Sequence, residues 1–448
     1  MPGRKPVPDG PGFSLPLRDG EPSPILFVMQ ELTSQERRVL DALDHDGLLD
    51  AICALVAIPS TGGFETPAQE FVSELMGRIG LEVDQWELDF EALAQHPAHA
   101  VECERDHGLG VVARMGEGSG GASLILNGHV DVVPPGQEER WSGPPFVPWV
   151  VDDRIYGRGA VDMKAGLCSA VFAAKAIKDS GVRLAGTLLI ESVIGEEDGG
   201  VGTLATIFRG YRADGAIVME PTNLEVATTG AGCFNFRVRV PGQAAHGALR
   251  SEGVSAIQKS FGVLAALDRL ERARNADGDP IIPGDLPFPI SVGTVSGGEW
   301  ASSVPEEVVF EGRYGVRPGE DPDEARSALE SAVAGAGEED YWLRDHPAEV
   351  EWWGGRYEPS RINPDTGISA AVREAHRAVT GRPAQVTGVP YGSDMALLVN
   401  HGATPTVLYG PGDVRNAHAP DEFVPIDEVV IAARSLALTA LRFCGTQP

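Results

Sequence analysis

Short apolar runs that end in polar, chemically active residues recur along this chain. SLILNG leads into His129, GTLLIESVIG into Glu196, and GAIVM into Glu220. Apolar runs of this kind are typical of buried strands in a parallel sheet. The carboxyl ends of such strands lie at one edge of the sheet, where α/β proteins bind ligands. We therefore expect one site that is assembled from segments distant in the sequence.

After Asp162 the apolar residues have the spacing of a helix. This spacing predicts a helix that begins at Asp162. Apolar residues recur there every three or four positions, at Leu167, Ala170, Val171, Ala174 and Ile177. Farther along, GISAAVREAHRAV predicts another helix, and TPTVLYG predicts a strand that leads to His418. These segments complete an α/β fold in which helices flank a mixed sheet.

The pattern changes after Glu220-Pro221-Thr222. An alternating strand (FNFRVRV) is followed by a helix, two strands (PISVGTVSG and EEVVFEGRYGV), a second helix and a last strand, AEVEWWGG. This order predicts a compact α+β insert from about Ala227 to Gly355. We expect a tail over 1–28, a catalytic domain in two parts (29–226 and 356–448), and the insert over 227–355.

The first 28 residues are rich in proline, glycine and charge, and their apolar stretch ILFVM is too short for a signal peptide or a membrane span. Met29 precedes QELTSQERRVLDAL, in which Thr33 and Glu36 have the spacing of a helix capping box. We expect an unstructured tail, or a true start at Met29.

The amino-acid composition narrows the classes of molecule that this protein is expected to bind. The chain has 448 residues, is 42% hydrophobic and carries a formal net charge of −29, which opposes nucleic acids and anionic membranes. A small molecule is the expected partner. The five cysteines lack CxxC spacing, so neither a disulfide framework nor a thiolate zinc site is indicated, and a reducing cytoplasm fits.

Two histidines and several carboxylates form a candidate metal site at these strand ends. Imidazoles with carboxylates suit zinc and are compatible with cobalt or manganese. If one carboxylate is shared, five ligands hold two ions: His129, Asp162, Glu197, Glu220 and His418. Glu196 is then left as a general base, and Asp131 is placed to accept the second N–H of His129. A single histidine or glutamate pair of this kind is more often the solvated end of a loop. The metal-site hypothesis rests on all of these residues occurring together in this order.

The chain resembles the zinc metallopeptidase and deacylase family of acetylornithine deacetylase, succinyl-diaminopimelate desuccinylase, aminoacylase and carboxypeptidase G. The likeness runs from about Leu40 to the end. Its motifs are LVAIPS, NGHVDVVPPG, WSGPPF, YGRGAVDMKAG, IGEEDGGVGT, MEPT and GPGDVRNAHAPDEFVPIDEV. The ending is most similar to the acetylornithine-deacetylase branch.

The resemblance implies a di-zinc catalytic domain and an inserted lid that also forms a homodimer. It implies that Asp162 bridges two ions, with Glu197 and His418 on one ion and His129 and Glu220 on the other. It further implies that Glu196 is the base, that Asp131 orients His129, and that His246 of the lid donates to the oxyanion. Substrate contacts are implied for Arg313, Gly392, Ser393 and Asp394.

Two local features depart from this picture. Where the family has an asparagine before Val-Pro in the lid, this chain has Ser302, a shorter donor. The stretch that holds His96, His99, Cys103 and His107 resembles a second metal cluster, but it is polar and lies outside the motifs, so we expect a solvated loop.

Three functions compete. The first is removal of an acetyl, succinyl or similar group from an N-acyl amino acid, in which metal-activated water attacks the amide and Glu196 carries the proton to the amine. The second is a dipeptidase or carboxypeptidase on the same scaffold. The third is a non-catalytic, ligand-binding relative, which would lack a ligand or Glu196, and none is missing.

Overall fold

The computed structural model describes residues 32–116, 118 and 120–447. The expected tail, and Met29 with it, lie outside these residues. The capping box that was predicted at the first helix is present: the Thr33 hydroxyl accepts from the Glu36 N–H at 3.2 Å, and the Glu36 carboxylate accepts from the Thr33 N–H at 2.7 Å. None of the described helices is both long and apolar enough to cross a membrane.

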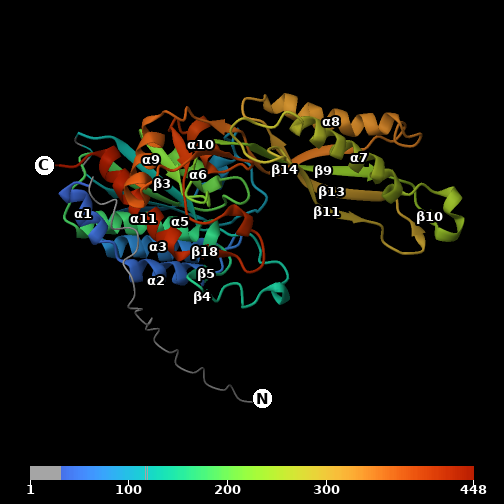
Figure 1. The fold of residues 1–448 in the computed structure, drawn as a ribbon. Coiled ribbons are helices and arrows are strands. Elements are labelled where there is room, and N and C mark those ends of the chain that lie inside the picture. Colours follow the sequence, from blue (N-terminus) through green and yellow to red (C-terminus); the bar gives the residue numbers. More distant parts are fainter. Residues whose placement is uncertain (1–31, 117, 119, 448) are drawn as a thin grey trace, which may run out of the picture.

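A large mixed sheet organises the catalytic part of the molecule (Figure 1). Strands β6, β3, β7 and β17 are parallel neighbours, and antiparallel strands flank them on both sides. Within the described residues the sheet follows the order β1 (Glu82–Glu87), β2 (Leu109–Met115), β6 (Thr187–Val193), β3 (Ser123–His129), β7 (Gly215–Val218), β17 (Thr406–Leu408), β8 (Val226–Gly230) and β15 (Ser360–Arg361), with β16 (Val386–Val389) paired to β8.

Helices lie on both sides of this sheet (Figure 1). Helix α5 packs against α11 and helix α6 against α10, and their apolar faces join one buried core with β3, β6 and β7. The helices of this part are α1 (Ser34–Asp41), α2 (His45–Val56), α3 (Thr66–Ile79), α4 (Phe90–Leu93), α5 (Ala165–Asp179), α6 (Val201–Arg209), α9 (Gly367–Thr380), α10 (Asp394–Asn400) and α11 (Ile426–Cys444).

The insert is a separate layer of two helices on a four-stranded antiparallel sheet, and it extends away from the catalytic part (Figure 1). All of its predicted strands and helices are present, and they bury a core of their own. Its elements are β9 (Gly232–Pro241), β10 (Ala245–His246), α7 (Ala256–Asn275), β11 (Ile290–Gly297), β12 (Ser303–Val304), β13 (Glu307–Val316), α8 (Pro322–Glu338) and β14 (Glu349–Tyr357).

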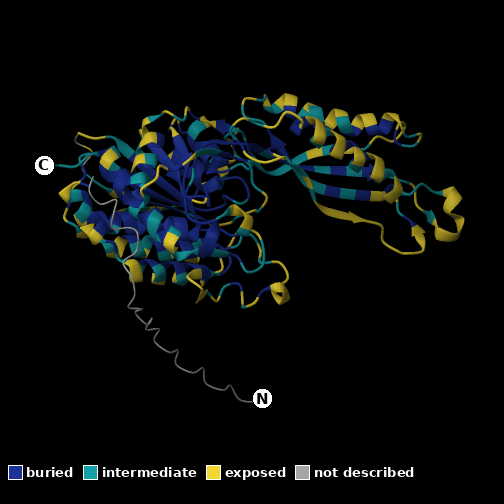
Figure 2. Ribbon diagram, in the orientation of Figure 1, coloured by how far each residue is buried: buried dark blue, intermediate teal, exposed yellow. Residues whose placement is uncertain are grey.

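Sheet membership moves the predicted limits of the insert. Ala227 lies inside β8, which pairs with β16 and β17 of the large sheet, so we define the insert as residues 232–357, from β9 to β14. Alternate residues of β9 are buried, and Phe234, Phe236, Val238 and Val240 point toward α7 and α8. Figure 2 shows how far the insert's outer surfaces, including β11, are exposed.

A buried ion pair fixes the segment that carries Asp162. Arg158 pairs with Glu422, and both side chains are almost fully buried. Glu422 also accepts from the main-chain N–H groups of Val161 and Asp162, at 3.0 and 3.3 Å. Glu422 precedes β18 (Phe423–Pro425), which forms a small sheet with β5 (Arg154–Tyr156) and β4 (Trp149–Val151). This small sheet therefore joins two distant segments beside Asp162.

Replacing Arg158 with methionine should lower the free energy of unfolding by about 3 kcal/mol, because it leaves the Glu422 carboxylate buried without its partner. The matched control is Arg209→Met, which breaks the partly exposed pair with Asp84 and should cost about 0–1 kcal/mol. Urea unfolding of both variants measures the difference. Equal losses would mean that the Arg158–Glu422 pair does not stabilise the fold more than a surface pair does.

Candidate functional site

The parallel strands of the large sheet deliver most of the predicted site residues to one edge. His129 is the last residue of β3, Glu196 and Glu197 follow β6, and Glu220 follows β7. Strands β6, β3 and β7 are adjacent and parallel, so their carboxyl ends are side by side. Residues from distant segments therefore lie together at this edge, as the sequence pattern predicts.

Asp162 reaches the same point from a different kind of segment. It lies in an irregular turn, η4 (Ala160–Lys164), and its own dihedral angles are not helical. The regular helix α5 begins after it, at Ala165, so the expectation that Asp162 opens the helix is wrong by one turn. The hydrogen bonds from this turn to Glu422 hold the aspartate outside the helix, where its carboxylate faces His129.

The predicted ligands are close together. His129 Nε2 is 3.2 Å from Asp162 Oδ1 and 3.9 Å from both Glu196 Oε2 and Glu220 Oε1. On the other side of Asp162, His418 Nε2 is 3.1 Å from Glu197 Oε2 and 3.5 Å from Asp162 Oδ2. Asp162 thus lies between the two imidazoles, one oxygen toward each.

Buried negative charge dominates the electrostatics of this cluster. Burial, followed by the nearby Glu220, raises the pKa of Glu196 well above its usual range. Burial, followed by Asp162, does the same to the pKa of Glu220. Although burial by itself would lower it, contacts with Asp162 and Glu197 raise the pKa of His418 to about 11. A cation bound among these four carboxylates would relieve their mutual repulsion.

The donor set fits divalent metal ions. Two groups of ligand atoms lie close enough to hold a cation, namely His129 with Glu196 and Glu220, and His129 with Asp162 and Glu197. Nitrogen and oxygen donors in this combination are those that zinc accepts. Distance does not separate Glu196, the predicted base, from Glu220, the predicted ligand, because both are equally far from His129.

Asp131 plays a different part from the one predicted. The second ring nitrogen of His129 lies 2.9 Å from the main-chain oxygen of Asp131 and 3.7 Å from its carboxylate. The carboxylate instead accepts from the Glu197 N–H at 3.0 Å. Asp131 therefore orients the imidazole through its backbone and holds the Glu196-Glu197 turn through its side chain.

The Gly392–Asp394 loop lies beside the site, but two of its three residues are buried. Asp394 is fully buried and accepts from Thr203 Oγ1 at 2.7 Å and from the Tyr357 hydroxyl at 3.2 Å. The Tyr357 hydroxyl also lies 2.8 Å from the main-chain oxygen of Glu196. A predicted substrate contact by Asp394 is thus replaced by a structural one, in which Asp394 holds Tyr357 under the Glu196 turn.

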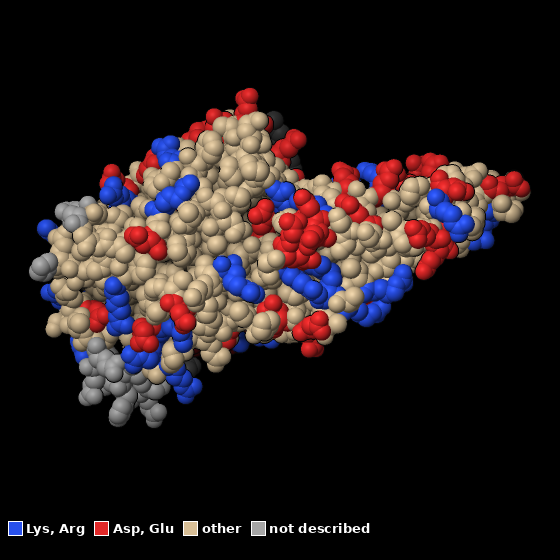
Figure 3. Space-filling model, turned by 90° about the horizontal axis from the view of Figure 1, so that it is seen from above, with Lys and Arg blue, Asp and Glu red and all other residues tan. Residues whose placement is uncertain are grey.

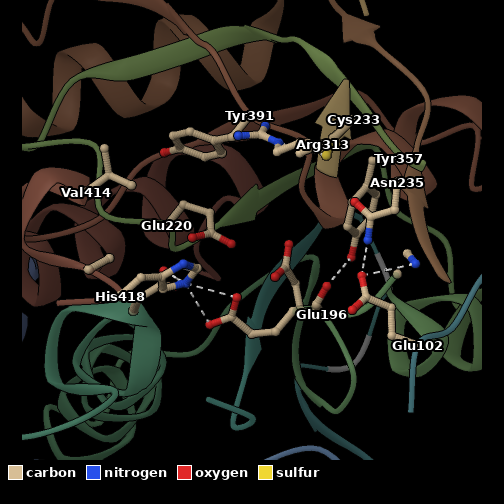
Figure 4. Close-up of a pocket in the computed structure, with 16 residues that line it drawn as sticks. Glu102, Glu196, Glu220, Cys233, Asn235, Arg313, Tyr357, Tyr391, Val414 and His418 are labelled. Atoms are coloured by element: carbon tan, nitrogen blue, oxygen red, sulfur yellow. Dashed lines mark hydrogen bonds and ion pairs between the residues drawn. The ribbon is translucent and has the colours of Figure 1, made fainter. Parts of the chain in front are cut away.

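A cavity of about 340 Å³ opens above the cluster, a size suited to a small ligand (Figure 4). The predicted residues that line it are Asp162, Glu196, Glu197, Glu220, Arg313, Gly392 and His418. Sequence reasoning missed the lining residues Glu102, Cys233, Asn235, Tyr357 and Tyr391. Tyr391 adjoins the predicted Gly392 loop, which was a usable signal, whereas Glu102 and Asn235 carried none.

Arg313 faces this cavity from β13. Its Nε lies 2.7 Å from Cys233 Sγ, and its Nη2 donates to the Pro390 carbonyl at 3.1 Å. Figure 4 shows the guanidinium beside the Tyr391 ring, on the opposite side of the cavity from Glu102. Gly392 also lines the cavity, and a Cβ there would come within 2.4 Å of the Tyr357 Cβ, so only glycine fits.

His246 and Ser302 are not part of this cavity. His246 lies in β10 at the far end of the insert (Figure 1), is exposed, and accepts from the Ala248 N–H at 3.1 Å. The Ser302 carbonyl accepts from Gly247 at 2.6 Å in the same hairpin. The His246 side chain therefore does not reach the site of its own chain.

The histidine-rich stretch after α4 is only partly the solvated loop that was expected. His107 is exposed. Neither of the two groups of candidate metal ligands found among the described residues includes a residue of this stretch. Arg105, however, is buried between Glu65 and Asp198, at 2.6 and 2.9 Å. The stretch therefore packs against the Glu196-Glu197 turn, and it contributes Glu102 to the cavity.

The family model described as peptidase family M20/M25/M40 matches residues 125–442. The N-formyl-4-amino-5-aminomethyl-2-methylpyrimidine deformylase of Bacillus subtilis (strain 168) is 29% identical over 414 residues, covering 85% of this chain and 92% of that protein. The acetylornithine deacetylase of Myxococcus xanthus is 29% identical over 348 residues, covering 75% of this chain and 84% of that protein.

Solved structures of the same fold include a tripeptidase from Staphylococcus aureus, with a TM-score of 0.68, 21% identity, and coverage of 89% of this chain and 99% of that one. A dipeptidase from Saccharomyces cerevisiae has a TM-score of 0.74, 15% identity, and coverage of 92% and 99%. The family match spans most of the chain and includes every predicted metal ligand, so this protein belongs to peptidase family M20/M25/M40, a family of metal-dependent hydrolases of amide bonds.

Proposed function

We propose that this protein is a deacylase that cleaves the amide bond between a short acyl group and a small amine-bearing molecule. The observation that carries the proposal is the cluster of His129, Asp162, Glu197, Glu220 and His418 at the floor of a small cavity, with Glu196 facing the same space. An N-acyl amino acid remains the expected substrate class.

Asp162 is placed to share two ions, because one of its oxygens faces His129 and the other faces His418. Glu220 with His129 would hold one ion, and Glu197 with His418 would hold the other. Zinc suits these donors best, and cobalt or manganese is compatible with them. When bound, such ions supply a water acidified to near neutral pH and polarise the carbonyl.

Glu196 is our candidate general base. Its carboxylate lines the cavity, and its raised pKa suits a group that takes a proton from the attacking water and returns it to the departing amine. The main chain of Glu196 is held by the Tyr357 hydroxyl. Tyr357, positioned in turn by Asp394, thereby fixes the direction from which the base approaches the substrate.

Arg313 is our candidate for binding a substrate carboxylate. It faces the cavity from the insert, and its planar guanidinium matches a carboxylate geometrically. Two of its nitrogens are held by Cys233 and the Pro390 carbonyl, which fix the orientation of the group.

We propose that the insert forms a homodimer and that His246 completes the site of the partner copy. The edge strand β11 pairs on one side only within the described residues, and Val295 on it is 62% exposed. Phe261 on α7 is also 62% exposed. An unpaired edge beside exposed apolar side chains suits association with a second copy. Because His246 is remote from its own cavity, an oxyanion role requires the partner's cavity.

The relatives suggest two amines for the released product. One relative is named as a deformylase of an aminomethylpyrimidine and another as a deacetylase of acetylornithine, and both names describe removal of a small acyl group. The pyrimidine deformylase is the second candidate function, favoured by a likeness that spans 85% of this chain. A peptidase of the same family would instead release amine from dipeptides.

The purified protein loaded with zinc or cobalt should release primary amine from N-formyl, N-acetyl or N-succinyl substrates, and dialysis against a chelator should abolish this release until metal is restored. A panel of these substrates with dipeptides and the formylated pyrimidine, assayed for free amine, measures it. Release from dipeptides alone would replace the deacylase with a peptidase.

Glu196→Gln should keep its metal and lower kcat by about 10²–10⁴-fold, because the amide cannot carry the proton. Elemental analysis of the purified variant separates the two roles that distance leaves equivalent. Loss of metal together with activity would make Glu196 a ligand, and near-normal turnover with metal bound would rule it out as the base.

Tyr357→Phe removes one hydroxyl while keeping the ring that packs on Gly392. We expect kcat to fall by about tenfold while KM and metal content stay close to those of the parent, because the variant frees the Glu196 main chain without touching a ligand. Tyr391→Phe serves as the control, because Tyr391 lines the cavity and forms no hydrogen bond with Glu196 in the described part of the chain. Equal effects of both variants would contradict a positioning role for Tyr357.

His246→Ala and Glu196→Gln should each be inactive alone, and their equimolar mixture after subunit exchange should regain about a quarter of the parent activity. Recovery follows because half of the dimers pair an intact base with an intact histidine in one site. If the parent is a monomer in light scattering, or if the mixture stays inactive, His246 does not act across a dimer.

A further inference from the structure

Glu102 is a carboxylate of the cavity that the catalytic cluster does not use. Figure 4 shows it beside Asn235, on the side of Glu196 away from His418. It comes from the stretch after α4, whereas Asn235 belongs to β9 of the insert. Its position is therefore at the junction between the two parts of the molecule, next to the metal ligands but not among them.

The backbone around Glu102 is shaped to receive its side chain. The pairing of β14 with β9 shifts register between Trp352 and Arg356, and Gly354 and Gly355 lie in this irregular stretch. A Cβ on Gly354 would come within 2.6 Å of Glu102 Cγ, and one on Gly355 within 3.2 Å of Glu102 Oε1. Two consecutive glycines thus leave the space that the carboxylate occupies.

The position of Glu102 is also fixed from behind. The N–H of Cys103, the next residue, donates to Asp198 Oδ2 at 2.8 Å, and Arg105 is buried between Asp198 and Glu65. Asp198 directly follows the Glu196-Glu197 pair in sequence. The carboxylate of Glu102 is consequently held at a defined place relative to the base, as a binding group must be.

One oxygen of Glu102 is occupied and the other is available. Oε1 accepts from the Asn235 amide and from the Gly355 N–H at 3.3 Å, and in the described part of the chain no hydrogen bond is made to Oε2. No lysine or arginine among the described residues forms an ion pair with Glu102. A carboxylate in a ligand cavity that lacks a cation of its own is suited to bind one.

The surface around the cavity carries negative charge, as Glu102 does. Figure 3 shows acidic side chains gathered where the catalytic part meets the insert, with a smaller basic group beside them. The chain as a whole carries a net charge of −29. Such a field attracts cations and repels anions on approach, although it does not select among cations. Selection requires a placed group such as Glu102.

We propose that Glu102 is a specificity residue that binds a second, nitrogen-bearing group of the substrate, either an ammonium or an amino-substituted heterocycle. The inference rests on the proposed deacylase function and narrows it to acyl derivatives of diamines. The amide under attack lies over the cluster of metal ligands, and the second nitrogen donates to Glu102 Oε2. Acetylornithine and the formylated aminopyrimidine both carry such a group.

The test compares substrates that differ only in the second nitrogen. Nα-acetyl-ornithine is paired with N-acetyl-norvaline, and the formylated aminomethylpyrimidine is paired with its analogue lacking the 4-amino group, so that the two arms separate the two nitrogen sources. Glu102→Gln keeps an acceptor for Asn235 and Gly355, removes the charge and replaces the available Oε2 acceptor with an NH₂ donor. Glu104→Gln, in the same stretch but away from the cavity, is the matched control.

The parent and Glu104→Gln should prefer the nitrogen-bearing member of at least one pair by about tenfold or more in kcat/KM, and Glu102→Gln should lose that preference through KM while the neutral member is unaffected. An equal loss on both members would make Glu102 a structural link between the two parts. An unchanged preference, or no preference in the parent, would also overturn the proposal.

Binding of the released amines separates this inference from the proposed function. Calorimetry with ornithine against norvaline, and with the aminomethylpyrimidine against its analogue lacking the 4-amino group, needs no turnover. If no acyl substrate is cleaved but the parent prefers the diamine and Glu102→Gln does not, the deacylase proposal fails and the role of Glu102 stands. If turnover occurs and neither amine pair nor substrate pair is distinguished, the role of Glu102 fails alone.

Discussion

The repulsion among buried carboxylates at the ends of β6, β3 and β7 is the constraint on which the rest of the structure depends. Asp162, Glu197 and Glu220 approach one another around His129, and burial raises the pKa of Glu197 and Glu220. Cations bound in its centre would stabilise such a group, and rigid walls around it keep the carboxylates in place. Several buried polar contacts of the catalytic part serve as these walls.

Three sets of contacts provide that rigidity, and each comes from a different part of the chain. The Arg158–Glu422 pair holds the irregular turn before α5, from which Asp162 projects. The Asp131 carboxylate holds the turn after β6. On the far side, the buried pair of Asp198 with Arg105 ties that turn to the stretch after α4. Because these supports come from separate segments, the site keeps its geometry only when the whole catalytic part is folded.

The insert supplies residues that line the cavity of its own chain, whereas the proposed metal ligands come from the catalytic part. Strands β9 and β13 place Asn235 and Arg313 over the cavity, and the irregular end of β14 places Tyr357 under the Glu196 turn. The metal ligands all belong to the catalytic part. In the proposed function, the substrate would bind between the metal-ligand cluster and the residues that the insert places over the cavity. Variation in these insert residues is a simple way for relatives of one family to act on different amides.

The outline of the fold and a candidate set of metal ligands could be predicted from the sequence alone. The apolar runs that end at His129, Glu196 and Glu220 predicted where strands end. A strand buried on both faces consists of consecutive apolar residues, so the end of the run marks the end of the strand. The alternation in FNFRVRV likewise predicted β9 and the change to an antiparallel insert.

Only the tertiary structure decided the direction and the surroundings of individual side chains. Asp394 is buried and bonded to Tyr357, His246 lies far from its own cavity, and Glu102 lines the cavity against Gly354 and Gly355. These outcomes depend on which distant segments pack against one another, and no local periodicity records that.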